Sequence, residues 1–127
     1  MPFVRITLNS DPGRAARERL ALGATSLMAD LLGKRADLTS VLVEVVKGTW
    51  SVGDAVAPRA AHIEALVTTD TNTAAEKARF VQAAMALLER EVPGLYPATY
   101  AVVREVPASD WGWGGLTQEA RRPRAAA

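Results

Sequence analysis

Pro2 is the residue with the clearest chemical potential in this sequence, because it directly follows the start methionine. Removal of a start methionine favours a small second residue, and here it would leave Pro2 as a free secondary amine. The unperturbed pKa of an α-amino group is roughly 8, and burial or a cationic neighbour would lower it. Such an amine can be neutral near pH 7 and act as a general base or a nucleophile. The competing interpretation is a proline that merely promotes methionine removal.

Few other residues offer catalytic or metal-binding chemistry. The chain has no cysteine, which excludes disulfides, thiolate metal sites and cysteine nucleophiles. His62 is the only histidine, so a Ser-His-Asp triad or a zinc site would depend on that one residue. A histidine at a strand end in a subunit interface is the simpler interpretation. Proton transfer by a free Pro2 amine would need neither a metal ion nor an organic cofactor, so we expect none.

Length, charge and hydropathy predict a single soluble domain. The chain has 127 residues, a length that fits one domain with a real core. Its formal net charge is +1, which favours neither nucleic acid nor a membrane surface as a partner. No apolar run approaches the ~20 residues of a transmembrane helix, and no signal peptide is recognisable. We expect a cytoplasmic protein.

The first half of the chain has the pattern of a strand, a helix and a second strand. Apolar and polar residues alternate over Phe3–Leu8, which is the period of a half-buried strand. Asp11 is a candidate N-cap for a helix from Arg14 to about Leu32. The apolar residues of this helix recur at helical spacing, at Leu20, Ala24, Leu27 and Leu31. A valine-rich strand over 40–47 and a turn or short hairpin over 48–53 follow.

The second half repeats this pattern. Strands are expected over 62–68 and 99–106, and Thr73-Ala-Ala-Glu76 is a capping-box signature for the helix between them. The apolar stripe of that helix comprises Phe80, Val81, Ala84, Leu87 and Leu88. The pairs that lie 61 positions apart are Trp50 and Trp111, Gly53 and Gly114, and Leu27 and Leu88. Internal repetition of this kind indicates a repeated architecture.

The repeat predicts an α+β fold of two tandem β-α-β units in a single domain. We place the first unit at 1–53, a linker at 54–61, the second unit at 62–116 and a tail at 117–127. Each crossover should be right-handed and make its two strands parallel, which gives a four-stranded sheet with two helices on one face. The other face of so small a sheet needs a partner surface, so we expect a homo-oligomer.

These features together resemble the tautomerase superfamily. They are Pro2, the β-α-β unit, the Leu-Thr-Ser-Val segment at 38–41 and a Trp-x-x-Gly hairpin, with a close match at 110–115. The smallest members, the 4-oxalocrotonate tautomerases, have one such unit per chain and use the N-terminal proline as a base. This chain looks like a fused version, and the resemblance covers residues 2–116. It implies a tautomerase/MIF-like fold and a trimer.

The resemblance also implies roles for individual residues. Pro2 matches the catalytic proline, and Trp50 and Trp111 match the aromatic position that walls the pocket. The substrate-binding arginine of the second strand falls near Leu42, which cannot replace it. In the second unit the same position falls near Tyr100, where the distantly similar cis-3-chloroacrylic acid dehalogenases place a tyrosine.

Two arginines are candidates for the missing cation. Arg14 follows the first strand, close to the position at which the small tautomerases carry their other substrate-binding arginine. Arg5 shares a strand face with Phe3. Arginine suits this task because its fork can pair a carboxylate with two hydrogen bonds. The competing interpretation makes Arg14 a solvated residue and Arg5 part of an ion pair between subunits. The arginines that dehalogenases and malonate semialdehyde decarboxylases carry after the third strand are replaced by Asp70-Thr-Asn72.

These roles predict an enzyme, a tautomerase-like isomerase that transfers a proton on a small 2-oxo or enol carboxylic acid with Pro2 as general base. Two alternatives remain open. The same proline could serve the hydration, dehalogenation or decarboxylation of a small acid. The chain could also be a non-catalytic ligand-binding or assembly module, which a retained Met1 would favour because it turns the amine into an amide.

Overall fold

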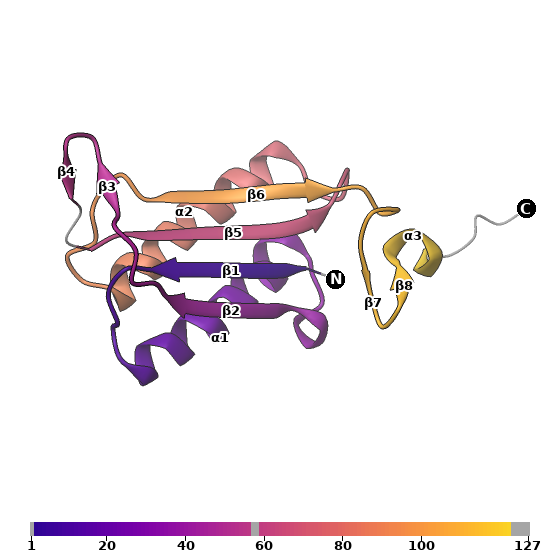
Figure 1. Ribbon diagram of the computed structural model, residues 1–127. Coiled ribbons are helices and arrows are strands. Elements are labelled where there is room, and N and C mark those ends of the chain that lie inside the picture. Colours follow the sequence, from indigo (N-terminus) through magenta and orange to yellow (C-terminus); the bar gives the residue numbers. More distant parts are fainter. Residues whose placement is uncertain (1, 57–58, 123–127) are drawn as a thin grey trace, which may run out of the picture.

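The computed structural model describes residues 2–56 and 59–122, and its centre is a four-stranded mixed sheet (Figure 1). The strands lie in the order β2-β1-β5-β6. Their bounds are Phe3–Leu8 for β1, Ser40–Val45 for β2, Ala61–Thr68 for β5 and Tyr100–Val106 for β6. β1 and β5 are antiparallel, whereas β2 pairs in parallel with β1 and β6 pairs in parallel with β5. Met1, part of the expected linker and the end of the expected tail lie outside the described residues.

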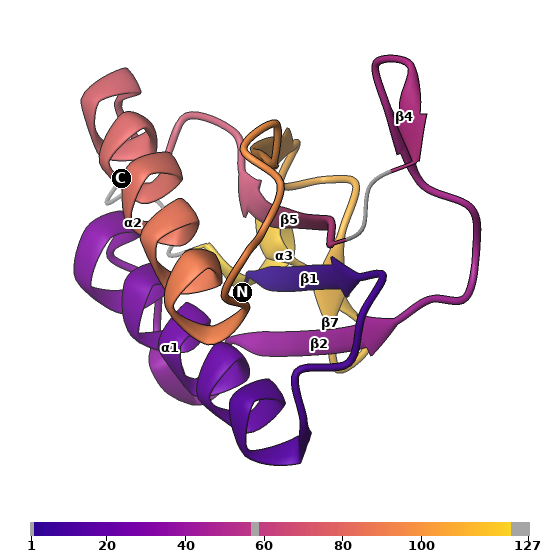
Figure 2. The ribbon, with the colours of Figure 1, turned by 90° about the vertical axis from the view of Figure 1, so that its left-hand side faces the viewer.

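Two helices cover one face of this sheet, which confirms the predicted α+β fold of two β-α-β units (Figure 2). α1 (Arg14–Leu32) connects β1 to β2, and α2 (Ala74–Glu91) connects β5 to β6. Their bounds agree with the sequence patterns that predicted them. Within the described ranges, no helix is both long and apolar enough to cross a membrane.

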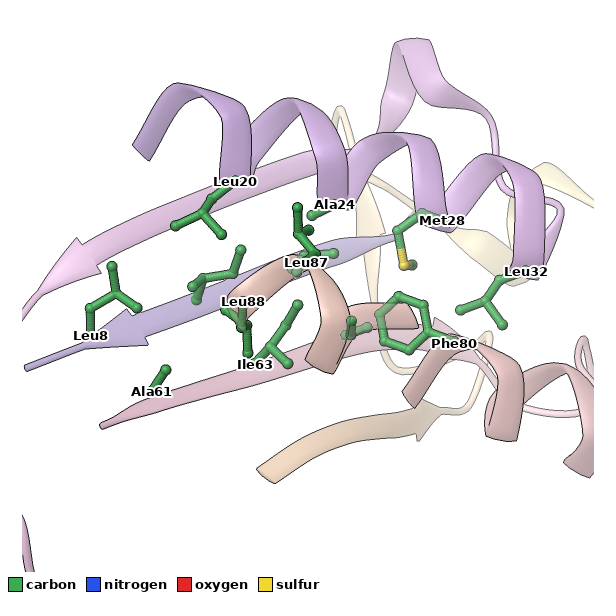
Figure 3. Packing of buried hydrophobic residues seen from close by; sticks show 14 of the residues in the cluster. Leu8, Leu20, Ala24, Met28, Leu32, Ala61, Ile63, Phe80, Leu87 and Leu88 are labelled. Atoms are coloured by element: carbon green, nitrogen blue, oxygen red, sulfur yellow. The ribbon is translucent and has the colours of Figure 1, made fainter. Parts of the chain in front are cut away.

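The hydrophobic core lies between the two helices and the sheet (Figure 3). Val4, Ile6 and Leu8 of β1 are fully buried, which confirms the alternation predicted for the first strand. The buried residues of α1 recur every four positions, at Ala16, Leu20, Ala24, Met28 and Leu32. Leu27 and Leu31, which we placed in this stripe, are only half-buried, because α1 packs along an i, i+4 ridge.

The two units repeat with different offsets in the helices and in the hairpins. Buried helix residues correspond at an offset of 60 positions: Leu20 with Phe80, Ala24 with Ala84, and Met28 with Leu88. The predicted pairing of Leu27 with Leu88 is therefore wrong by one residue. Gly53 and Gly114, which are 61 positions apart, both have a left-handed backbone, with φ of 62° and 60°. In α2, Val81 is 39% exposed and does not belong to the buried stripe.

The two helices begin in different ways. In α2 the predicted capping box is confirmed: the Thr73 hydroxyl accepts a hydrogen bond from the Glu76 N–H (3.1 Å), and the Glu76 carboxylate accepts one from the Thr73 N–H (2.8 Å). In α1, Gly13 occupies the N-cap and the prediction of Asp11 is wrong. The Asp11 carboxylate instead accepts the Gly13 N–H and pairs with Arg17, and both contacts hold the pKa of Asp11 below its usual range.

Short elements complete the two units. A 3-10 turn, η1 (Ala36–Leu38), precedes β2, and β2 ends at Val45 rather than at the expected Lys47. The two hairpins are β3 (Ser51–Val52) with β4 (Ala55–Val56), and β7 (Gly112–Trp113) with β8 (Leu116–Thr117). After β8 the chain forms one further helical turn, α3 (Gln118–Arg121), in the region that we assigned to a tail.

The face of the sheet away from α1 and α2, here called the helix-free face, carries paired charges. Arg5 of β1 lies 3.6 Å from the Glu44 carboxylate on β2, and it is also opposite Glu64 of β5 in register. Glu64 in turn accepts a hydrogen bond from Arg104 of β6 (3.1 Å). Leu42, opposite Arg5 on β2, is 40% exposed on this face.

Replacing Thr73 by alanine should lower the free energy of unfolding by about 1 kcal/mol, because the first turn of α2 loses its N-cap oxygen. Urea unfolding measures this loss. Ser26→Ala is the control, since that exposed hydroxyl bonds to the Leu22 carbonyl inside α1 and caps nothing. Equal stability of Thr73→Ala and the wild type would contradict the role of the box.

The capping box should also contribute to the dependence of stability on pH. The Thr73 N–H bound to the Glu76 carboxylate lowers the pKa of Glu76 in the folded chain. The contribution is therefore present above the unfolded pKa of that carboxyl and is lost as the pH falls through the folded value. Glu76→Gln removes the titrating carboxyl and keeps an oxygen acceptor for the Thr73 N–H, so it should weaken this acid-side loss in urea unfolding measured over a series of pH values.

Candidate functional site

Pro2 lies at one end of the sheet, together with the ends of two other strands. β1 begins where β5 and β6 finish, because β1 is antiparallel to β5 and β6 is parallel to β5. We call this the Pro2 end of the sheet. Figure 1 shows that the β7–β8 hairpin and α3 lie beyond this end, to the right of the start of β1. Pro2 and Trp111 therefore lie at the same end.

Pro2 is held in place by the strands on both sides of β1. Its side chain is buried, and its carbonyl oxygen accepts a hydrogen bond from the Ser40 N–H (3.2 Å). The next residue, Phe3, is already paired with Ser40 of β2 and Leu66 of β5. A free amine at this position would start from a fixed backbone. While Met1 is attached, the Pro2 nitrogen belongs to a peptide bond and is not basic.

Trp111 is fixed beside the end of β5. Its indole N–H donates a hydrogen bond to the Thr68 hydroxyl (3.2 Å), and its carbonyl accepts the Gln118 N–H (2.8 Å). Gly112 follows, and a Cβ added there would lie 1.8 Å from the Leu116 carbonyl oxygen. The hairpin therefore requires glycine at this position, next to the half-buried tryptophan.

A surface pocket of about 270 Å³ lies at the same end of the sheet. Its lining residues are Thr68, Thr71, Gln118, Arg121 and Arg122. The two arginines belong to the segment that sequence analysis assigned to a tail, so their place in a site was missed. The sequence signal for α3 is Thr117, because threonine is a favoured N-cap residue. In the structure its hydroxyl accepts the Ala120 N–H (3.0 Å).

Lys34 contacts one of the lining residues of this pocket. The Lys34 ammonium donates a hydrogen bond to the Thr71 hydroxyl (2.8 Å). Burial lowers the pKa of Lys34, and the Glu76 carboxylate partly opposes this effect. The described part of the chain contains no group of three histidine, aspartate or glutamate side chains placed to hold a metal ion.

The other predicted site residues lie away from Pro2 within one chain. Arg14 and Tyr100 start elements at the opposite end of the sheet, and Trp50 precedes the hairpin that follows β2 there. β1 alone spans about 20 Å between the two ends. Arg14 is exposed and pairs with Glu18 (3.1 Å), and the Tyr100 side chain is largely exposed. Arg5 lies between the two ends, on the helix-free face.

His62 also lies at the end opposite Pro2. It is half-buried on the helix-free face, where Thr7 and Tyr100 are its neighbours in register. The start of β5 is an internal peptide bond, so this second end of the sheet offers no terminal amine.

Comparison with known proteins defines the fold. No family model and no curated protein matches the chain. Among solved structures, it is similar to a native fused 4-OT, with a TM-score of 0.82 and 21% identity over 93% of this chain and 97% of that one. It is also similar to macrophage migration inhibitory factor of Toxoplasma gondii, with a TM-score of 0.79 and 21% identity over 91% of this chain and 98% of that one.

A macrophage migration inhibitory factor-like protein from Entamoeba histolytica is similar as well, with a TM-score of 0.78 and 17% identity over 91% of this chain and 97% of that one. The chain therefore has a tautomerase/MIF-like fold, and the resemblance drawn from the sequence is confirmed at that level. At these identities the similarity shows the fold alone.

Replacing Gly112 by alanine should displace Trp111, because the new Cβ would overlap the backbone of β8. We expect a red-shifted, more readily quenched tryptophan fluorescence and a loss of any Pro2-dependent turnover by at least about tenfold. The melting temperature should change little, since the hairpin lies outside the core.

Gly48→Ala is the matched control for this substitution. Gly48 is not left-handed, and no described atom lies within 4 Å of a Cβ added there. Wild-type fluorescence and turnover in Gly112→Ala would show that the hairpin does not position Trp111 as described.

Proposed function

We propose that this protein is a tautomerase-like isomerase that uses Pro2, after removal of Met1, to transfer a proton on a small 2-oxo or enol carboxylic acid. The observation that carries the proposal is the position of Pro2 in a tautomerase/MIF-like fold. It is buried at the start of a central strand, at the end of the sheet where Trp111 is hydrogen-bonded to Thr68. The candidate amine and Trp111 therefore share one end of the sheet.

The proposed chemistry needs one base that can accept a proton and return it. Neutral Pro2 takes a proton from the enol hydroxyl, or from the carbon next to the carbonyl, and the resulting ammonium returns a proton at the other position. Substrate and product are isomers, so no oxidant, reductant or cofactor enters the balance. Burial favours the neutral amine, and Trp111 would help to exclude water. A backbone N–H can polarise the carbonyl.

We further propose that the working form is a homo-trimer. Three of the similar solved structures are described as fused 4-OT trimers, one symmetric and two asymmetric. The helix-free face supports the proposal, because it carries half-exposed Leu42 and the largely exposed Tyr100 side chain beside its charged pairs. Assembly is also the way in which Trp50, Arg14 or Tyr100 of a partner subunit could approach Pro2.

The test of the reaction combines intact mass with turnover of phenylenolpyruvate or 2-hydroxymuconate. The mass of the native protein should lack Met1, and Pro2→Ala should lower the turnover by about 100-fold or more, as loss of a general base does. Pro12→Ala is the matched control, because Pro12 lies in the loop between β1 and α1, at the opposite end of the sheet. Full activity in Pro2→Ala, or active protein that retains Met1, would reject Pro2 as the base.

The test of the assembly compares two leucines that are both exposed in the isolated chain. Leu42→Glu should convert the trimer to a monomer, because it places a charge on the proposed buried face. Leu22→Glu, on the outer side of α1 where Leu22 is 70% exposed, should leave the trimer intact. Light scattering after gel filtration measures both. A monomeric wild type at micromolar concentration would contradict the proposal.

A further inference from the structure

The pocket beside α3 is lined by hydrogen-bond donors and cations. We call it the α3 pocket, defined by Thr68, Thr71, Gln118, Arg121 and Arg122. The hydroxyl, amide and guanidinium groups of these residues can all donate hydrogen bonds, and no carboxylate is among the described lining residues. The pocket therefore has the charge and the donor set for an anion.

Arg121 is already oriented in this pocket. One of its terminal nitrogens donates a hydrogen bond to the Trp113 carbonyl (2.8 Å), and its guanidinium carbon lies 3.7 Å from the centroid of the Trp113 ring. Stacking of this kind limits the rotamers of the side chain. Because guanidinium has five N–H donors, the remaining donors of Arg121 can still meet a ligand.

Arg122 is the available cation of the pocket. Over residues 2–56 and 59–122, its side chain forms no hydrogen bond or ion pair. By contrast, both cations that we selected from the sequence are paired with carboxylates: Arg14 with Glu18 and Arg5 with Glu44. Of these arginines, Arg122 has the least to give up when it binds a carboxylate.

The α3 pocket is attached to the same residues that fix Trp111. The Glu119 N–H donates a hydrogen bond to the Ala108 carbonyl (2.9 Å), and the Gln118 N–H donates one to the Trp111 carbonyl (2.8 Å). Thr68 lines the pocket and also accepts the Trp111 indole N–H. The antiparallel ladder pairs Phe3 of β1 with Leu66 of β5, and Thr68 lies two residues further along β5, at the Pro2 end of the sheet.

We propose that the α3 pocket binds the carboxylate of the acid on which Pro2 acts, with Arg122 as its principal ligand and Arg121 as a pre-oriented second donor. This inference rests on the proposed function for the identity of the substrate. A carboxylate suits two adjacent guanidinium groups because it accepts paired hydrogen bonds from their planar forks. The volume suffices for a small acid, since one water takes up about 30 Å³ of liquid.

The first experiment measures binding alone and does not depend on turnover. Oxalate is titrated into the full-length wild type, Arg122→Gln and Pro2→Ala by calorimetry. We expect one site per chain, a loss of affinity of at least about tenfold in Arg122→Gln, and binding in Pro2→Ala within about threefold of wild type. Arg90→Gln removes the same charge from the last turn of α2, at the opposite end of the sheet, and should bind oxalate normally.

The second experiment assigns the pocket to the substrate of Pro2. Arg122→Gln should raise KM for phenylenolpyruvate at least about tenfold with little change in kcat, and should leave turnover of its uncharged methyl ester unchanged. Unchanged oxalate binding in Arg122→Gln would overturn the anion site, as would an equal loss in Arg90→Gln. An equal KM increase for acid and ester would overturn the carboxylate assignment.

The two proposals fail in different ways. If Pro2→Ala keeps full turnover, the proposed function is rejected and with it the assignment to a Pro2 substrate, whatever the oxalate titration gives. If Pro2→Ala is inactive and Arg122→Gln matches the wild type in both KM and oxalate affinity, Pro2 stands as the base and the α3 pocket is rejected.

Discussion

The antiparallel pairing of β1 with β5 is the interaction on which the rest of the structure depends. It joins the two β-α-β units edge to edge and places Ile6 opposite Ile63, with both side chains buried under the helices. The direction of this pairing fixes which chain segments meet. The start of β1 meets the end of β5, so Pro2 lies near the hairpin of the second unit and far from the hairpin of its own unit.

Close contact between the helices completes the core above this pairing. A Cβ at Gly23 of α1 would lie 2.8 Å from a methyl group of Leu87 on α2, so the glycine allows the two helices to approach. At the end of the sheet opposite Pro2, Arg19 of α1 pairs with the nearly buried Glu91 of α2 at 2.7 Å. The two helices thereby form one packed layer over the four strands.

Local patterns in the sequence predicted the fold, and non-local geometry limited the prediction of the site. The alternation at Phe3–Leu8 and the capping box at Thr73 are signals within a few residues, and both are confirmed. The side of α1 that is buried depends on the sheet beneath it, so Met28 is buried where the sequence pattern had indicated Leu27. Sequence spacing also cannot tell which hairpin lies near Pro2, since that follows from the direction of strands joined across a long connection. Arg121 and Arg122 were missed because α3 has a single turn and almost no periodicity.

Because both β-α-β units belong to one chain, substitutions can accumulate in one unit independently of the other. Two identical single-unit chains would share every substitution, so a change that suits one sheet end would be imposed on the other. Here each end is encoded by its own codons, and the end that holds Trp50 and His62 carries an internal peptide bond where Pro2 begins the other unit. A substitution at one end therefore need not be repeated at the other.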